Sequence, residues 1–391
     1  MINKLNKIGY DLKDITVVQS PISYYNHRGD VNPYTTICNR VNMYPIFVSP
    51  MASVTDQHNY KTWINNGFTP IVPRSVGKSD VNPNGLTFEE RIELSHETFV
   101  SFSLEESYSL FNIWESEGVT TDNGKFYICI DIAHGTLSRL YEICKKFNHK
   151  YGKDIIEIMT GNIATPDAYE FYADAGVSWI RLSIGSGSRC TSAANVSIYY
   201  PSATLIDELY KKKVTYDLNH VSEGPKLIMD GGIKNFDDIQ KALVLGADAV
   251  MCGNIFARAE EACGEIIYLH ENNLDLSDAI PQEEYFKKLE TLKENDDWAH
   301  DAYERLKKRK PYRNYYGMST KRAQRETFGQ GNKTAEGIER PIKIEYPIKK
   351  WAENMESYLR SCMTYTNSGT LNELKNAEVI ILGGGDAAFR K

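Results

Sequence analysis

Residues 226–254 read Lys-Leu-Ile-Met-Asp-Gly-Gly-Ile-Lys-Asn-Phe-Asp-Asp-Ile-Gln-Lys-Ala-Leu-Val-Leu-Gly-Ala-Asp-Ala-Val-Met-Cys-Gly-Asn, and they contain the clearest indication of architecture in this chain. The short apolar runs at each end are typical of buried strands. Between them, residues 235–246 have apolar side chains at spacings of three and four, which predicts a helix. A strand, a helix and a second strand in this order predict one parallel βαβ unit.

The same alternation recurs along the chain. Eight apolar runs are predicted to be strands: 45–51, 69–73, 98–103, 126–131, 155–161, 179–185, 226–232 and 249–254. Amphipathic segments such as 166–175 and 202–213 lie between them and predict helices. Strand and helix alternating eight times predict a parallel sheet closed into a (β/α)₈ barrel, a single α/β domain of the TIM-barrel type.

An open, doubly wound sheet is the competing architecture, because it would show the same alternation. Such a sheet normally carries a glycine fingerprint after its first strand, and this chain has none there. The glycine run in Val379-Ile-Ile-Leu-Gly-Gly-Gly-Asp lies within 13 residues of the last residue, so no helix can follow it. We therefore expect a tail strand or a loose end at that position.

The expected organisation is a catalytic barrel over residues 1–375 and a tail over 376–391. Residues 281–310 are highly charged and predict a solvated helix, and a glycine- and polar-rich loop is expected from residue 312. This loop forms part of a flap expected over about 311–346. A last helix over 348–362 is predicted to pack against the outside of the barrel.

Composition limits the possible partners. The chain has 391 residues, 41% of them hydrophobic, and a net charge of −7, which argues against nucleic acid or an anionic membrane as the main partner. No apolar run approaches the roughly 20 residues that span a bilayer. The first residues form no apolar segment of signal-peptide length. Seven cysteines without a Cys-x-x-Cys pair indicate neither a disulfide framework nor a zinc site. We therefore expect a cytoplasmic protein.

Polar or glycine residues follow most of the apolar runs. In a barrel, these positions share the C-terminal face, where the active sites of this fold lie. They are Ser49, Asp131, Gly161-Asn162, Gly185, Asp230 and Gly253.

The loop Ser183-Ile-Gly-Ser-Gly-Ser-Arg-Cys-Thr-Ser places one cysteine after a glycine-rich turn. Glycine lets backbone N–H groups approach a ligand closely, and the neighbouring serines add hydroxyls. Cysteine is the strongest side-chain nucleophile near neutral pH. Cys190 is therefore a candidate nucleophile beside an anion-binding turn.

Two further turns are candidates for binding phosphate. Asp230-Gly-Gly-Ile offers a carboxylate for ribose hydroxyls and two glycine amides, although alone it could equally be a plain strand-to-helix turn. Gly253-Asn254 follows the last predicted strand, where barrels commonly bind phosphate. Together with the cysteine loop, these turns suit a ligand with a phosphate and a diol, such as a nucleoside monophosphate.

A series of short motifs follows the chain over residues 8–375. In order, they are Ser49-Pro-Met, Asp131-Ile-Ala-His-Gly, Gly161-Asn-Ile-Ala-Thr, Gly185-Ser-Gly-Ser-Arg-Cys-Thr-Ser, Met229-Asp-Gly-Gly-Ile, Gly246-Ala-Asp-Ala-Val-Met-Cys-Gly, Tyr316-Gly-Met-Ser and Ala335-Glu-Gly-Ile-Glu. With these motifs in this order, the chain resembles the inosine monophosphate dehydrogenase and guanosine monophosphate reductase family, whose fold is the (β/α)₈ barrel.

The resemblance implies a role for each matching residue. It makes Cys190 the nucleophile that attacks C2 of the purine to give a thioimidate, and Ser192 and Glu336 its catalytic partners. The nucleotide-binding residues would be Ser49, Met51, Ser188, Asp230, Gly232, Gly253, Asn254, Tyr316, Gly317, Met318 and Ser319. The nicotinamide cofactor would lie against Asp131, Ala133 and His134. A monovalent cation such as K⁺ would be bound by carbonyls of Gly185, Gly187 and Cys190.

Some of these positions have plainer interpretations or depart from the family. His134 could be a structural hydrogen bonder, and Glu336 could bind the base in either enzyme. Ser186 replaces a usual proline, Arg189 an apolar residue and Ser192 a threonine, which puts loop stiffness and the cation site in question.

The two branches of the family differ in the fate of the thioimidate. A dehydrogenase uses an arginine and a tyrosine on its flap to activate water, whereas a reductase expels ammonia and accepts hydride from NADPH. Here only 15 residues separate Ser319 from Ala335, and no tyrosine occurs between Gly317 and Glu345. Arg325-Glu-Thr-Phe lacks the phenol. The regulatory CBS module often inserted after the second strand is absent too, since about 50 residues separate Pro73 from Phe126.

These differences favour a GMP reductase that converts GMP and NADPH to IMP, ammonia and NADP. The motifs that begin at Asp131, Asp230 and Glu336 look more like IMP dehydrogenase, which would convert IMP, NAD and water to XMP and NADH. That activity is the alternative, and a nucleotide-sensing barrel without turnover is the third hypothesis. Relatives are usually homotetramers, which we expect here.

Overall fold

Eight parallel strands close into a barrel in the order β10-β11-β4-β5-β6-β7-β8-β9. The computed structural model describes residues 8–80, 82–186, 195–293, 300–317, 320–328 and 337–383. The barrel strands are β4 (Ile46–Val48), β5 (Thr69–Val72), β6 (Phe99–Phe102), β7 (Phe126–Ile130), β8 (Ile156–Ile163), β9 (Trp179–Leu182), β10 (Lys226–Asp230) and β11 (Ala249–Cys252). Seven of these strands lie within predicted runs, and β8 extends two residues beyond its run of 155–161. The (β/α)₈ prediction is confirmed and the open sheet is excluded.

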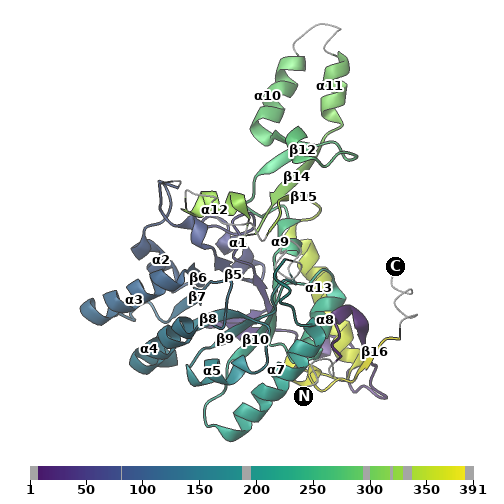
Figure 1. Cartoon of the computed structure of the whole chain (residues 1–391). Coiled ribbons are helices and arrows are strands. Elements are labelled where there is room, and N and C mark those ends of the chain that lie inside the picture. The colour runs from purple at the N-terminus through teal and green to yellow at the C-terminus, as the bar shows by residue number, and fades with distance from the viewer. Residues whose placement is uncertain are drawn as a thin grey trace.

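Helices surround the barrel (Figure 1). They are α1 (Tyr60–Asn65), α2 (Phe88–Leu94), α3 (Leu104–Glu117), α4 (Ser138–Ile155), α5 (Ala168–Asp174), α7 (Ser202–Asn219), α8 (Phe236–Val244) and the short α9 (Asn254–Ala257).

The residues at the start of α3 show why a helix begins at this position. The Ser103 side chain accepts from the Glu106 N–H at 3.1 Å, and the Glu106 carboxylate accepts from the Ser103 N–H at 2.6 Å. This capping box satisfies two otherwise unpaired amides.

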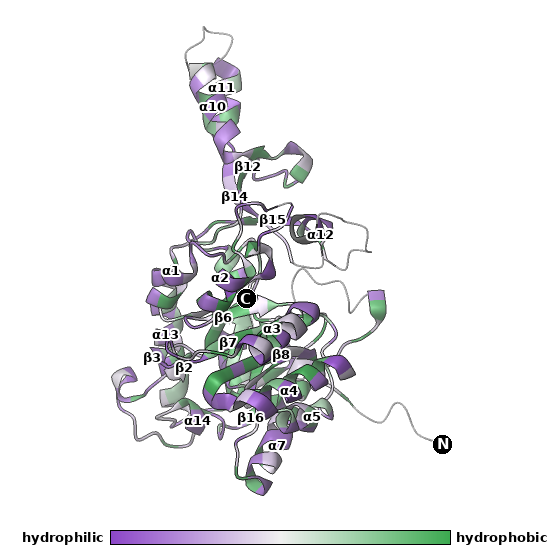
Figure 2. Cartoon of the chain, turned by 90° about the vertical axis from the view of Figure 1, so that its left-hand side faces the viewer, coloured by the Kyte–Doolittle hydropathy of each residue, from purple (hydrophilic) through white to green (hydrophobic). Residues whose placement is uncertain are grey.

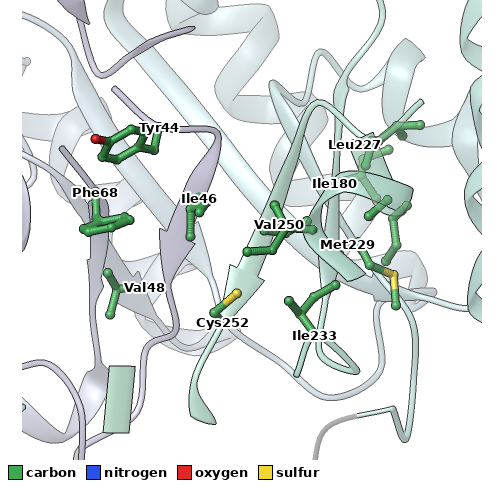
Figure 3. Packing of buried hydrophobic residues seen from close by; sticks show 14 of the residues in the cluster. Tyr44, Ile46, Val48, Phe68, Ile180, Leu227, Met229, Ile233, Val250 and Cys252 are labelled. Atoms are coloured by element: carbon green, nitrogen blue, oxygen red, sulfur yellow. The ribbon is translucent and has the colours of Figure 1, made fainter. Parts of the chain in front are cut away.

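The core has two layers because side chains alternate along each strand. Phe47 belongs to the cluster inside the barrel, whereas its neighbours Ile46 and Val48 belong to the cluster between strands and helices. Figure 3 shows Ile46 and Val48 of β4 beside Val250 and Cys252 of β11 in that outer layer. Hydrophobic residues accordingly gather on barrel strands such as β6 and β7 in Figure 2.

A second sheet with the order β13-β12-β14-β15 stands above the barrel. It is antiparallel and consists of β12 (Ile266–Leu269), β13 (Ile280–Pro281), β14 (Lys310–Tyr315) and β15 (Arg340–Lys343). Residues 270–309, which we call the arm, connect β12 to β14 and carry helices α10 (Gln282–Lys293) and α11 (His300–Lys307). Figure 1 shows these two helices side by side and protruding from the barrel.

Two expectations for this region need correction. Residues 281–310 form two separate helices where one was predicted. The loop expected from residue 312 is wrong, because β14 pairs with β12 and β15 and is followed by helix α12 (Lys321–Phe328). The arginine and asparagine that made this segment look like a loop, Arg313 and Asn314, are buried in the structure.

The last helix and the tail strand confirm their predictions. Helix α13 (Ile348–Tyr365) packs on the outside of the barrel, where Trp351 contacts the aromatic rings of Phe236 and Phe256. Strand β16 (Val379–Ile381) pairs antiparallel with β1 (Ile15–Val17). The smaller elements are the hairpin β2 (Thr35–Ile37) and β3 (Arg40–Met43), α14 (Leu371–Leu374), and the 3₁₀ turns η1 (Leu12–Asp14), η2 (Arg28–Asp30), η3 (Arg74–Val76) and η4 (Leu276–Asp278). Among the described helices, none combines the length and apolarity needed to cross a membrane.

Candidate active site

A buried arginine joins two carboxylates at the C-terminal end of the barrel. Trp179 of β9 belongs to the inner cluster, and Arg181, two residues later, faces the same way. The Arg181 Nη1 lies 2.6 Å from Asp131 Oδ1, and its Nη2 lies 2.8 Å from Asp230 Oδ2. Strands β7 and β9 are not neighbours, so the contact between Arg181 and Asp131 crosses the barrel mouth.

The electrostatics of this cluster follow from burial and opposite charge. Burial would raise the pKa of Asp131, but the positive charges of Arg181 and Arg74 outweigh it and hold that pKa below its ordinary value. Burial would likewise lower the pKa of Arg181, yet Asp230 and Asp131 raise it well above its ordinary value. The mouth therefore contains one fixed cation between two carboxylates.

Asn162 links three of the turns at this face. Its side-chain amide donates to Asp230 Oδ2 at 2.7 Å and to the Ser183 carbonyl at 3.0 Å. The backbone carbonyl of Asn162 accepts a hydrogen bond from the Gly135 N–H at 3.2 Å. The turn after β7, the cysteine loop and the turn after β10 are therefore held together by one residue at the end of β8.

The start of the cysteine loop lies against the turn after β10. The Ser186 hydroxyl donates to the Asp230 carbonyl at 3.1 Å. A Cβ added to Gly232 would lie 3.6 Å from the Ser186 Cβ. Gly232 has a φ of +77°, a conformation that glycine adopts without strain. The Ser186 hydroxyl thus ties the start of the loop to the end of β10.

A second group lies around Gly253, which follows β11. A Cβ added there would lie 2.6 Å from the Tyr315 hydroxyl, 2.7 Å from Met51 Sδ and 3.6 Å from the Ser49 Cβ. The Tyr315 hydroxyl donates to Met51 Sδ at 3.4 Å. Gly317 also approaches Met51, since a Cβ there would lie 3.9 Å from the Met51 Cε. The structure therefore brings together the predicted residues Ser49, Met51, Gly253 and Gly317, with Asn254 next in the chain.

The other described positions lie at the expected face. Ala133 and His134 are exposed in the turn after Asp131, and His134 Nδ1 lies 3.2 Å from the Thr136 hydroxyl. Gly185 has a φ of +77°. Tyr316 is buried, and its carbonyl accepts from the Ser53 hydroxyl at 3.3 Å. The remaining predicted site residues lie outside the described ranges: Gly187, Ser188, Cys190, Ser192, Met318, Ser319 and Glu336.

Three residues at this face had no predicted role. Arg181 sits inside the apolar run Trp179-Ile-Arg-Leu, and a charged side chain within a predicted buried strand was a signal for it. The position of Asn162 after its strand predicts its place on this face but no function for it. Tyr315 lies in strand β14, and its side chain points toward Gly253; a loop prediction for this segment gives no alternation from which this orientation could be inferred.

Three other cysteines, Cys129, Cys144 and Cys252, are buried. Burial raises the pKa of the Cys129 thiol to about 12, so it remains protonated at neutral pH. Cys362 is half-buried, and burial raises its thiol pKa to about 11.

Comparisons with known proteins agree with this geometry. Residues 117–277 match the family described as "IMP dehydrogenase / GMP reductase domain". An inosine-5'-monophosphate dehydrogenase from Aquifex aeolicus is 36% identical over 141 residues, which are 36% of this chain and 27% of the relative. Another from Yersinia pestis is 27% identical over 267 residues, which are 66% of this chain and 45% of the relative. A GMP reductase from Buchnera aphidicola is 26% identical over 339 residues, which are 86% of this chain and 77% of the relative.

The matches therefore differ in extent. The chain spans about a quarter of the length of the Aquifex dehydrogenase and about three quarters of the Buchnera reductase. The matched domain contains β7 to β11 and the turns that converge on Arg181. The chain thus combines a closed eight-stranded barrel with a segment, residues 117–277, that is similar to the IMP dehydrogenase / GMP reductase domain, and its relatives carry both names.

Proposed function

We propose that this protein is a GMP reductase, which converts GMP and NADPH to IMP, ammonia and NADP⁺. The observation that carries the proposal is the flap. No tyrosine occurs from Gly317 to Glu345, so the segment lacks the phenol that a dehydrogenase of this family pairs with arginine to activate water. The greater coverage of the Buchnera GMP reductase supports the same assignment.

The barrel mouth suits a nucleoside monophosphate. In this proposal Asp230, held by Arg181 and Asn162, accepts hydrogen bonds from the ribose hydroxyls. The turns at Gly232 and Gly253 bind the phosphate with Ser188 and Asn254. Ser49, Met51 and the segment from Tyr316 to Ser319 line the base.

The turn after β7 fits a nicotinamide riboside beside that nucleotide. Asp131 is joined to Asp230 through the single side chain of Arg181, so ligands on the two carboxylates would be neighbours. Ala133 and His134 leave the turn exposed toward solvent, which gives a cofactor access. When bound, the reduced nicotinamide supplies the hydride, and NADPH is the form we propose.

The proposed reaction has two covalent steps. The Cys190 thiolate adds to C2 of GMP, and Ser192 with Glu336 delivers a proton to the 2-amino group, which leaves as ammonia. The purine is then bonded to sulfur as a thioimidate. Hydride addition at C2 and departure of the thiolate give IMP, so the purine is reduced by two electrons and the cofactor is oxidised by two.

The decisive assay uses the purified chain with GMP and NADPH. We expect loss of absorbance of the reduced cofactor, release of ammonia and formation of IMP in equal amounts. The control is the Cys190→Ala variant, which should be inactive. Substantial turnover by that variant would reject the covalent mechanism.

IMP dehydrogenase is the second candidate. It is favoured by the sequence of the motif Asp131-Ile-Ala-His-Gly, which resembles the dehydrogenases, and by the dehydrogenase names of several relatives. Formation of NADH and XMP from IMP and NAD⁺ would establish it in place of the reductase. A sensor without turnover is the third candidate, motivated by serine at 192. Tight GMP binding without either reaction would establish the sensor.

Three further proposals rest on the resemblance to this family. We propose that the protein is cytoplasmic and that it is a homotetramer. We also propose that K⁺ is bound by the carbonyls of Gly185, Gly187 and Cys190. Gel filtration with light scattering measures the assembly. Replacing K⁺ by Li⁺ in the assay should lower the rate, and an unchanged rate would remove the cation from the proposal.

A further inference from the structure

Arg313 is a buried cation in the sheet that carries the arm. It lies in β14 and is only 1% exposed. Its guanidinium uses all five N–H donors on backbone carbonyls. Nε donates to Ala257 at 3.1 Å, Nη1 to Ala262 and to Gly264 at 2.6 Å, and Nη2 to Ala259 at 3.1 Å and Glu260 at 3.3 Å.

These five carbonyls belong to one segment, residues 257–264, which runs from the end of α9 toward β12. Among the described residues, no carboxylate lies within ion-pair distance of Arg313. Burial lowers the pKa of its guanidinium, opposed by smaller effects of neighbouring groups. The cation is therefore stabilised by peptide dipoles, and its removal would leave several buried carbonyls without a donor.

Segment 257–264 and strand β14 both lie next to Gly253. Segment 257–264 continues directly from α9, which begins at Asn254 immediately after Gly253. Tyr315 is two residues beyond Arg313 in β14, so both side chains lie on the same face of that strand. The Tyr315 hydroxyl lies 2.6 Å from where a Cβ of Gly253 would stand.

We propose that Arg313 is a positioning residue for nucleotide binding: it clamps β14 to segment 257–264 and thereby sets the distance between Tyr315 and the Gly253-Asn254 turn. This inference rests on the proposed function, because it assigns that turn to the nucleotide phosphate. It also makes the root of the arm part of the substrate site, although the arm helices lie outside the barrel (Figure 1).

Gly264 provides a second means of testing the clamp. A Cβ at this position would lie 2.6 Å from the Ser53 carbonyl and 3.0 Å from both Cγ and Cδ of Arg313. A methyl group there must displace the arginine side chain or the backbone, so Gly264→Ala disturbs the clamp while leaving the guanidinium intact.

The experiment measures kcat, the KM for each substrate and the calorimetric Kd for GMP in the full chain. Arg313→Met should raise the KM and Kd for GMP by about tenfold or more, because small misplacements of binding groups are costly. The KM for NADPH and kcat should stay within about threefold. Arg313→Lys keeps a charge and three donors and should recover part of the loss, and Gly264→Ala should weaken GMP binding in the same direction.

Lys375→Met is the matched control, since Lys375 is also a buried cation, paired with Asp248 at 2.6 Å at the opposite end of the barrel. It should lower the unfolding temperature without changing the KM for GMP. An unchanged KM for GMP in Arg313→Met would overturn the inference. If that variant does not fold, unchanged values in both Arg313→Lys and Gly264→Ala would overturn it. Absence of both GMP binding and turnover in the wild-type chain would instead reject the proposed function.

Discussion

Arg181 and Asp230 form the central contact of the barrel mouth: the arginine donates from Nε at 3.0 Å to the same carboxylate oxygen that lies 2.8 Å from its Nη2. The two residues come from adjacent strands, β9 and β10, and the arginine side chain is only 10% exposed. Arg181 also binds Asp131, so this one arginine determines the orientation of both carboxylates.

Replacing Arg181 should therefore cost both stability and binding. Arg181→Met leaves two buried carboxylates without their cation and should lower the free energy of unfolding by about 3–5 kcal/mol. Arg181→Lys should cost less but should still raise the KM for GMP, because a single ammonium cannot reproduce the guanidinium geometry. Urea unfolding and steady-state kinetics measure the two effects. A Met variant as stable as the wild type would contradict the assigned role.

The pH dependence of stability should reveal the pair of Asp131 with Arg181. The pKa of Asp131 in the folded protein lies below its ordinary value of 3.8, so its contribution is fully present above that value. The contribution is lost as the pH falls from there through the folded-state pKa. The difference in unfolding free energy between wild type and Asp131→Asn should thus be large at neutral pH and shrink in acid.

The control for this titration is Asp207→Asn, which removes an exposed pair with Lys211. Exposed pairs contribute about 0–1 kcal/mol, so this variant should differ little from the wild type at any pH. A stability difference for Asp131→Asn that stays constant from neutral pH into acid would contradict the pairing.

Gly253→Ala should impair nucleotide binding for steric reasons. The backbone at this position has a φ of −105°, which alanine adopts readily, but its Cβ would meet the Tyr315 hydroxyl. We expect the KM for GMP to rise by about tenfold. Adding Tyr315→Phe removes the obstructing oxygen and should recover part of the loss. Gly29→Ala, where no atom lies within 4 Å of the new Cβ, should have no effect.

Alkylation should distinguish Cys190 from the buried thiols. Cys129 stays protonated at neutral pH because its pKa is raised to about 12, and thiols react as thiolates. Mass spectrometry after brief iodoacetamide treatment should therefore find Cys190 modified and Cys129 unmodified, with GMP protecting Cys190. Faster labelling of Cys129 than of Cys190 would argue against a nucleophilic role for Cys190.

The strands of the barrel were predictable because each is a short apolar run bounded by polar or glycine residues. The same logic placed Asp131, Asp230 and Gly253 on one face, since parallel strands bring their carboxyl ends together. It failed for residues 312–315, where Arg313 and Asn314 made a buried strand look like a loop. Their burial depends on carbonyls and side chains far away in the chain, which no local pattern contains.

The amino-acid sequence alone determined the barrel and the face on which the candidate site residues lie, because these follow from local periodicity and from short segments. Only the tertiary structure decided which side chains meet there. The pairing of Arg181 with Asp131 and Asp230, the approach of Tyr315 to Gly253 and the clamp of Arg313 on segment 257–264 all join distant residues. Their energies arise from burial and geometry that exist only after the barrel has closed.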